Sequence, residues 1–134
     1  MVDKEKSSKG KILVIDDDKM MASVVENVLS NEGYQIYTAT DGQDGLEKAT
    51  ELKPDLIFMD INMPDMDGYE TTMKLKSVNE LESTPVIFIS GLNPESEANK
   101  VFMTGGVSMI TKPFTNSQLI DVVKLAMGAV SKNI

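Results

Sequence analysis

The sequence predicts an α/β fold, an open, doubly wound parallel sheet with five strands and five helices. Three observations support this prediction. Short, uninterrupted apolar runs recur along the 134 residues, segments with helical periodicity separate them, and the two kinds of segment alternate strictly. Right-handed crossovers would place helices on both faces of such a sheet. A chain of this length accommodates one compact domain with one core.

Five strands are predicted from the apolar runs. The clearest are residues 12–15 (ILVI), 56–59 (LIFM) and 86–89 (VIFI), which lack the alternation of a half-exposed strand. Continuous runs of this length are typical of strands that are covered on both faces. Residues 34–39 and 107–110 are weaker candidates that complete the alternation.

The first two helices have clear boundaries. In residues 19–30 the apolar side chains recur at helical spacing, and Gly33 follows where a helix stop is expected. Asp41 precedes a second helix that runs to about Leu52 and is ended by Pro54.

Capping patterns mark the other three helices. Asp67 with Glu70 resembles a capping box, and Asn93 followed by Pro94 places a cap before a first-turn proline. A second capping box, Thr115 with Gln118, precedes an apolar stripe that consists of Leu119, Val122, Val123, Ala126 and Val130.

The ends of the chain suggest a single domain. Residues 1–9 are polar and are interpreted as a flexible tail, with the domain in residues 10–134. The chain stops four residues after the last helical stripe, so no attached output domain is expected. There is no signal-peptide pattern and no apolar stretch near the roughly 20 residues of a membrane span. We therefore expect a cytoplasmic protein without membrane insertion.

Composition restricts the chemistry. The formal net charge of -8 disfavours direct binding to nucleic acid or anionic lipid. The chain has no cysteine and no histidine, which excludes disulfides, Cys-based metal centres and Ser-His or Cys-His nucleophiles. Reactive groups must therefore come from carboxylates, hydroxyls, lysines, the backbone and a hard metal ion.

Polar residues follow the predicted strands at one edge of the sheet. Asp16 and Asp17 come after the first run, Asp60 after the third, Ser90 after the fourth, and Lys112 two residues after the last. Ligands of open α/β sheets bind at this edge. Taken singly, each residue is also an ordinary cap, turn or surface residue, but their coincidence at several strand ends favours a site.

The predicted site needs a cation. Asp16, Asp17 and Asp60 carry three negative charges if they are ionised, and close like charges are unfavourable. One Mg²⁺ ion, or Mn²⁺ in its place, together with Lys112 would balance them with oxygen ligands. A carboxylate in such a site can attack phosphorus, and Ser90 adds a hydrogen-bond donor for a phosphoryl oxygen.

Four segments resemble the signature blocks of two-component response-regulator receiver domains, in particular the single-domain, chemotaxis-regulator type. They are residues 12–18 (ILVIDDD), 56–70 (LIFMDINMPDMDGYE), 86–91 (VIFISG) and 110–114 (ITKPF). The resemblance covers the chain from about Lys11 to Val130. It implies a flavodoxin-like sheet with strand order 2-1-3-4-5.

The resemblance also implies roles for individual residues. Asp60 would be the phosphoacceptor, with Asp17 binding Mg²⁺ directly and Asp16 chiefly through water. The backbone carbonyl of Asn62 would be a further ligand, and Asp18 would lie outside the pocket. Ser90 would be the hydroxyl that moves toward the phosphoryl group. Lys112 would be its ammonium partner, on a bond to Pro113 that is usually cis in this family.

The implied function is signalling. A histidine kinase or phosphotransfer protein would donate the phosphoryl group, and a downstream protein target would bind the phosphorylated form, as a monomer or weak phosphorylation-dependent dimer. The domain would catalyse only its own phosphorylation and autodephosphorylation, so it would not be an enzyme in the usual sense. The output face would run from the fourth helix through the last strand to the fifth helix.

Three positions depart from the common receiver pattern. Ser90 replaces a more usual threonine, Gly91 stands where alanine is frequent, and Met109 occupies the usual place of a switch aromatic. The change at position 109 leaves open how phosphorylation would be coupled to the output face.

Two other functions remain as alternatives. A haloacid-dehalogenase-like phosphatase also combines an aspartate nucleophile, Mg²⁺, a hydroxyl and a lysine, but there the nucleophile follows the first strand. An unphosphorylated interaction scaffold is expected to lack the acceptor, an acid or the lysine, and this chain has all three.

Overall fold

The computed structural model describes residues 8–131 and contains one parallel sheet with the order β2-β1-β3-β4-β5. This order and the parallel pairing confirm the predicted topology. The strands are β1 (Lys11–Ile15), β2 (Gln35–Ala39), β3 (Leu56–Asp60), β4 (Val86–Ser90) and β5 (Ser108–Thr111).

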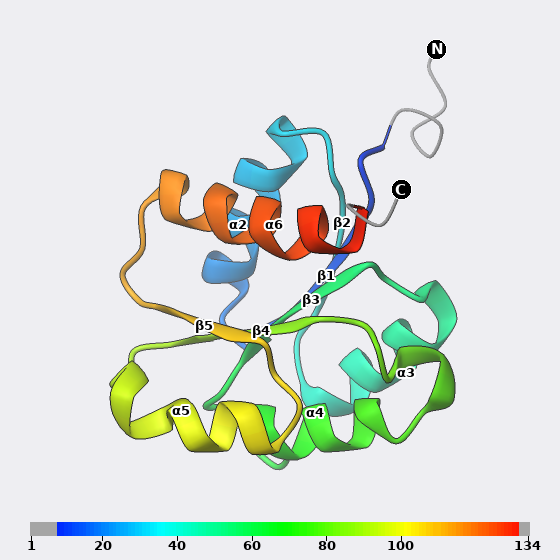
Figure 1. The fold of residues 1–134 in the computed structure, drawn as a ribbon, viewed down its shortest axis with the longest axis vertical. Helices are drawn as coiled ribbons and strands as arrows, with labels where there is room; N and C mark the ends of the chain where they lie inside the picture. Colours follow the sequence, from blue (N-terminus) through cyan, green and yellow to red (C-terminus); the bar gives the residue numbers. More distant parts are fainter. Residues whose placement is uncertain (1–7, 132–134) are drawn as a thin grey trace.

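Helices cover both faces of the sheet (Figure 1). Helices α2 and α6 lie on one side, and α3, α4 and α5 lie on the other. The five α-helices of the described residues are α2 (Lys19–Asn31), α3 (Gly42–Leu52), α4 (Gly68–Lys76), α5 (Pro94–Met103) and α6 (Asn116–Ser131).

The core consists of two apolar clusters that the sheet separates. In β1, Ile12 and Val14 belong to the cluster under α2 and α6, whereas Leu13 and Ile15 belong to the cluster under α3, α4 and α5. All four side chains are fully buried, because successive strand residues point to opposite faces and both faces are covered. The continuous apolar run is therefore explained by burial on both sides.

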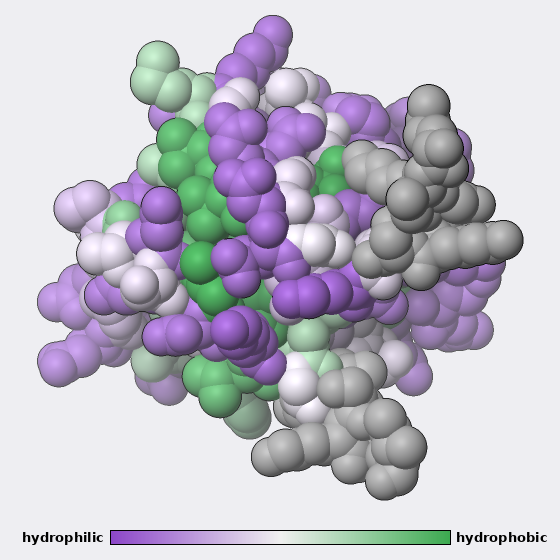
Figure 2. Space-filling view, turned by 90° about the horizontal axis from the view of Figure 1, so that it is seen from above, coloured by the Kyte–Doolittle hydropathy of each residue, from purple (hydrophilic) through white to green (hydrophobic). Residues whose placement is uncertain are grey.

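The cluster under α2 and α6 extends toward the surface. Figure 2 shows a band of hydrophobic residues on this side of the molecule, bordered by hydrophilic residues. Partly buried hydrophobic side chains of both helices pack against the cluster, and Val24 and Leu125 are exposed.

The caps predicted at Asp41, Asp67, Asn93 and Thr115 are present, and Asp18 supplies one that was not predicted. The carboxylates of Asp18, Asp41 and Asp67 accept backbone N–H groups at the starts of α2, α3 and α4, and the Asn93 side chain does so for α5. At the start of α6, the Thr115 N–H donates to the Gln118 side chain and the Gln118 N–H donates to the Thr115 hydroxyl. This last pair forms the reciprocal capping box that the sequence predicts.

The structure differs from the predictions at several boundaries. Asp60 and Ser90 are the last residues of β3 and β4 rather than the residues after them, since the sheet pairing extends one position beyond the apolar runs. A short 3-10 helix at Asn79–Leu81 was not predicted. It buries Leu81 in the cluster under α3, α4 and α5.

The N-terminal boundary is described only in part. Residues 1–7 of the expected tail lie outside the described residues. In its last two positions, the Lys9 N–H donates to the Gly33 carbonyl at 2.9 Å and the Ser8 hydroxyl bonds to Gly10. Within residues 8–131, no helix has the length and apolar character that crossing a membrane requires.

Candidate functional site

Three carboxylates meet at the carboxyl edge of the sheet. Asp16 and Asp17 follow β1 and Asp60 ends β3, and an oxygen atom of each lies within 4.8 Å of the other two. The two strands are adjacent, with Ile15 paired to Met59, so the parallel register brings the carboxylates together. The predicted acidic cluster is therefore present, with Asp16 and Asp60 buried and Asp17 exposed.

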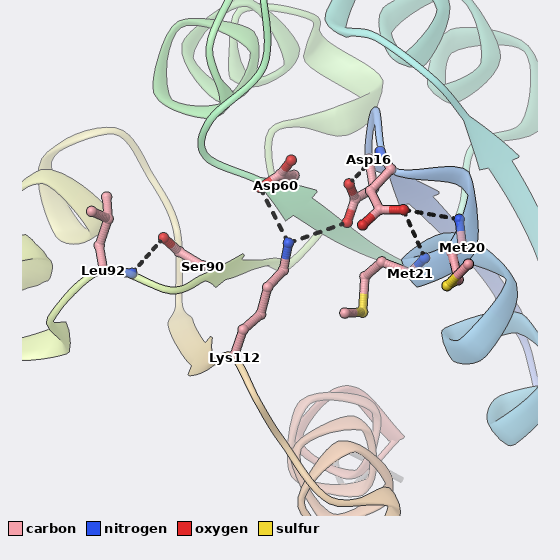
Figure 3. A network of polar contacts seen from close by, with 8 residues as sticks. Asp16, Met20, Met21, Asp60, Ser90, Leu92 and Lys112 are labelled. Carbon is pink, nitrogen blue, oxygen red and sulfur yellow. Dashed lines mark hydrogen bonds and ion pairs between the residues drawn. The ribbon is translucent and has the colours of Figure 1, made fainter.

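Lys112 reaches this cluster from β5. Its ammonium nitrogen lies 3.8 Å from one carboxylate oxygen of Asp16 and 3.8 Å from one of Asp60 (Figure 3). The Lys112 N–H donates to the Ser90 carbonyl at 2.8 Å, which fixes its backbone beside the end of β4. The Lys112–Pro113 peptide bond is cis, as the family resemblance implies.

Ser90 lies at the same edge but is turned toward its own loop. Its hydroxyl oxygen accepts the Leu92 N–H at 3.0 Å, and the residue is buried (Figure 3). The predicted hydroxyl is therefore at the carboxyl edge of the sheet, but its hydrogen bond is with the loop before α5.

The buried acids are electrostatically unfavourable when ionised. Burial raises the pKa of Asp60 to about 7, and the nearby Asp16 carboxylate acts in the same direction, while Lys112 opposes the rise. Burial also raises the pKa of Asp16, although the N–H of Asp18 and the charge of Lys112 counteract it. Lys112 is therefore a single positive charge beside three carboxylates, two of which are buried.

The donor set fits a hard divalent cation. One Asp16 carboxylate oxygen accepts the Asp18 N–H at 2.9 Å, whereas the other is buried without a hydrogen-bond donor. This second oxygen lies 3.8 Å from the Lys112 ammonium, but a buried carboxylate oxygen without a hydrogen bond is unusual and requires an explanation. Oxygen atoms from Asp16, Asp17 and Asp60 are the ligands that Mg²⁺ prefers.

Asp18 and Asn62 lie close in sequence to the acids of the cluster but are not part of it. Asp18 caps α2 by accepting the N–H groups of Met20 and Met21, in agreement with its predicted place outside the pocket. Asn62 is exposed in the loop after β3, two residues beyond Asp60, and the role of its carbonyl as a ligand remains a prediction.

Gly68 supports the site and was not predicted to do so from the sequence. Its N–H donates to the Ile61 carbonyl at 2.9 Å, and a Cβ atom at this position would lie 2.3 Å from the Asp60 carbonyl oxygen. The start of α4 therefore packs directly on the peptide that carries Asp60. The glycine after the cap Asp67 was the available sequence signal.

We expect Gly68→Ala to destabilise the fold by roughly 1–3 kcal/mol, because the methyl group would overlap backbone that cannot move freely. Urea unfolding monitored by circular dichroism measures this change. Gly91→Ala is the matched control, since a Cβ there meets nothing within 4 Å. Equal stability of the two variants would contradict the proposed close packing.

The sequence matches the response regulator receiver domain family over residues 12–124. The chain belongs to this family. It is a receiver domain of two-component signalling, with the flavodoxin-like fold and phosphoacceptor role of that family, and the phosphatase and scaffold alternatives are not favoured.

Relatives of known name match most of this chain. It is 37% identical over 121 residues to the protein PilG of Pseudomonas aeruginosa, with 90% of both chains covered. It is also 37% identical over 125 residues to a protein-glutamate methylesterase/protein-glutamine glutaminase of Archaeoglobus fulgidus, covering 91% of this chain but 34% of that protein. The second match is therefore to one part of a longer protein.

Solved structures share the fold of this receiver domain. The chemotaxis protein CheY4 of Vibrio cholerae superposes with a TM-score of 0.84 at 27% identity, covering 87% of this chain and 97% of that one. The receiver domain of NtrX from Brucella abortus gives a TM-score of 0.80 at 31% identity, covering 87% and 98%. Both likenesses extend over nearly the whole described domain.

Proposed function

We propose that Asp60 accepts a phosphoryl group from the phosphohistidine of a kinase or phosphotransfer protein. One observation carries this proposal: the buried Asp60 carboxylate lies beside two other acids and 3.8 Å from the Lys112 ammonium. Asp60 is also the member of the cluster whose pKa burial and Asp16 raise to about 7. A carboxylate with these neighbours can act as a nucleophile once its charge is compensated.

The transfer step uses the ionised form of Asp60. One of its carboxylate oxygens forms the bond to phosphorus while the bond from phosphorus to the donor imidazole nitrogen breaks, and that nitrogen retains the bonding electron pair. Lys112 compensates negative charge on Asp60 before the step and on the phosphoryl oxygens after it. Hydrolysis by water would regenerate the carboxylate and end the signal.

Asp16, Asp17 and Asp60 would hold a Mg²⁺ or Mn²⁺ ion, together with the backbone carbonyl of Asn62. Such an ion supplies charge neutralisation for the transferred group. The buried Asp16 oxygen that has no hydrogen bond supports this assignment, as does the grouping of three carboxylates around one ammonium. Asp16 also orients the site through its bond to the Asp18 N–H.

Ser90 would donate a hydrogen bond to a phosphoryl oxygen on Asp60. To do so its hydroxyl would turn from the loop, and the Leu92 N–H would lose its present acceptor. This coupled change would alter the loop before α5 and hence the surface that a downstream protein target recognises. We place this exchange in the cytoplasm, and the protein acts as a monomer or a weak phosphorylation-dependent dimer.

The proposal is tested by incubating the purified chain with acetyl phosphate, a small phosphoryl donor, and Mg²⁺, and then measuring its intact mass. We expect one phosphoryl group per chain, and little labelling when a chelator removes the cation. Release of many phosphate groups per chain from phosphate esters would instead support a phosphatase and contradict the proposed signalling role.

Asp17→Asn should remove most of the thermal stabilisation by Mg²⁺. A native chain with Mg²⁺ at 100 times its dissociation constant gains about 2.7 kcal/mol, because only the folded state has the assembled site. Thermal unfolding with and without Mg²⁺ measures the difference. Asp18→Asn is the control, since Asp18 is the adjacent acid but caps α2 instead. The ligand assignment fails if both variants keep the native response.

A further inference from the structure

Tyr69 joins three elements around the site. It lies on the first turn of α4, next to Gly68, and its ring packs against Phe88 of β4 with centroids 5.0 Å apart. Its hydroxyl donates to the Glu97 carboxylate of α5 at 2.7 Å, and the Lys100 ammonium lies 5.8 Å from the ring centroid. Tyr69 therefore holds α5 from the helix that packs on the peptide of Asp60.

In the contact between Tyr69 and α5, the tyrosine hydroxyl is the donor and the Glu97 carboxylate is the acceptor. Burial and the Glu97 carboxylate raise the pKa of Tyr69, so the hydroxyl remains protonated and acts as the donor at neutral pH. Hydrogen bonds to a charged acceptor are stronger than those between neutral groups. The Lys100 ammonium adds a favourable interaction with the face of the same ring.

Helix α5 is also linked to Ser90. Only three residues separate Ser90 from the first residue of α5, and the Ser90 hydroxyl accepts an N–H from within this short loop. A turn of the hydroxyl toward Asp60 would release that N–H. Because the loop is short, the start of α5 would have to adjust with it.

We infer that Tyr69 is a positioning residue that holds α5 in the arrangement of the unphosphorylated domain. Its bond to Glu97 opposes the movement of α5 that accompanies phosphorylation. The contact thereby couples Asp60 to α5 in a domain whose residue 109 is methionine and provides no aromatic ring. The inference rests on the proposed phosphoacceptor role of Asp60. By reciprocity of linkage, weakening the contact must strengthen binding of a phosphoryl group or its mimic at Asp60.

The inference is tested with Tyr69→Phe and Glu97→Ala. Beryllofluoride, which mimics a phosphoryl group on a carboxylate, is titrated with Mg²⁺ by calorimetry. We expect both variants to bind it about threefold to tenfold more tightly than the native chain, the effect of losing one net hydrogen bond. Amide hydrogen exchange should be faster within residues 94–103 of both variants before the mimic is added.

Matched controls separate this effect from general destabilisation. Tyr37→Phe removes a tyrosine hydroxyl that bonds to Gln35 within β2, and Glu95→Ala removes an exposed acid from the same first turn of α5. Both controls should bind within twofold of the native chain. A merely structural role for Tyr69 would speed exchange across the sheet without raising affinity.

The outcomes distinguish the two proposals. Native binding together with unchanged or weaker binding by Tyr69→Phe and Glu97→Ala would overturn the role of Tyr69 and leave the role of Asp60 intact. Absence of binding by the native chain would contradict the phosphoacceptor proposal, and the role of Tyr69 would fall with it.

Discussion

Asp60→Asn should abolish phosphorylation by a small donor in the presence of Mg²⁺. The amide is not a carboxylate nucleophile, and Asp16 and Asp17 are placed beside the acceptor rather than in its position. In intact-mass spectra we expect one added phosphoryl group on the native chain and none on the variant. This is a loss of the whole signal rather than a change in rate.

A carboxylate outside the acidic cluster provides the control. Asp121 is exposed on α6, outside the acidic cluster, so Asp121→Asn should be phosphorylated as the native chain is. Mg²⁺ must be present in every sample, because the ionised acceptor depends on compensating charge. Label that persists in Asp60→Asn at the native level would refute the assignment of the acceptor.

Without a divalent cation, the domain should lose stability as the pH rises from about 4 to about 7. Burial raises the pKa of Asp60 from 3.8 to about 7 in the folded state, so in this range the folded chain binds more protons than the unfolded chain. The free energy of unfolding must then fall with rising pH. At 1.36 kcal/mol per pKa unit, Asp60 alone contributes up to roughly 4 kcal/mol.

Two comparisons isolate this contribution. Asp60→Asn cannot ionise at that position, so its free energy of unfolding should change much less between pH 5 and pH 8. Mg²⁺ binds the ionised acids, so it should raise the free energy of unfolding of the native chain most strongly at the higher pH. Urea titrations in chelator and in Mg²⁺ at both pH values measure these effects. If the free energy of unfolding of Asp60→Asn fell with pH as steeply as that of the native chain, another group would be the cause.

Much of the scaffold is predictable because local signals agree with the tertiary arrangement. The apolar run of β1 has no alternation, and the structure buries both of its faces. The caps Asp41 and Asn93 begin helices where the pattern predicts them. The short 3-10 helix was missed because a three-residue element leaves no periodicity, and only the burial of Leu81 identifies it.

The sequence by itself determined the order of strands and helices and the residue types that arrive at the carboxyl edge. Asp60, Ser90 and Lys112 each follow or end an apolar run, and the carboxyl ends of parallel strands share one edge of the sheet. They could therefore be assigned to that edge before any distance was available. The acid-rich, histidine-free and cysteine-free composition also restricted the site to oxygen ligands.

Only the tertiary structure decided which acids are buried, where Ser90 points and what holds α5. Asp16 and Asp17 are adjacent in sequence, yet only Asp16 is buried and has a carboxylate oxygen without a hydrogen bond. The bond between Tyr69 and Glu97 joins residues 28 positions apart on two helices. Burial and such long-range contacts depend on how separate elements pack together, and a local sequence pattern carries no measure of the distance between them.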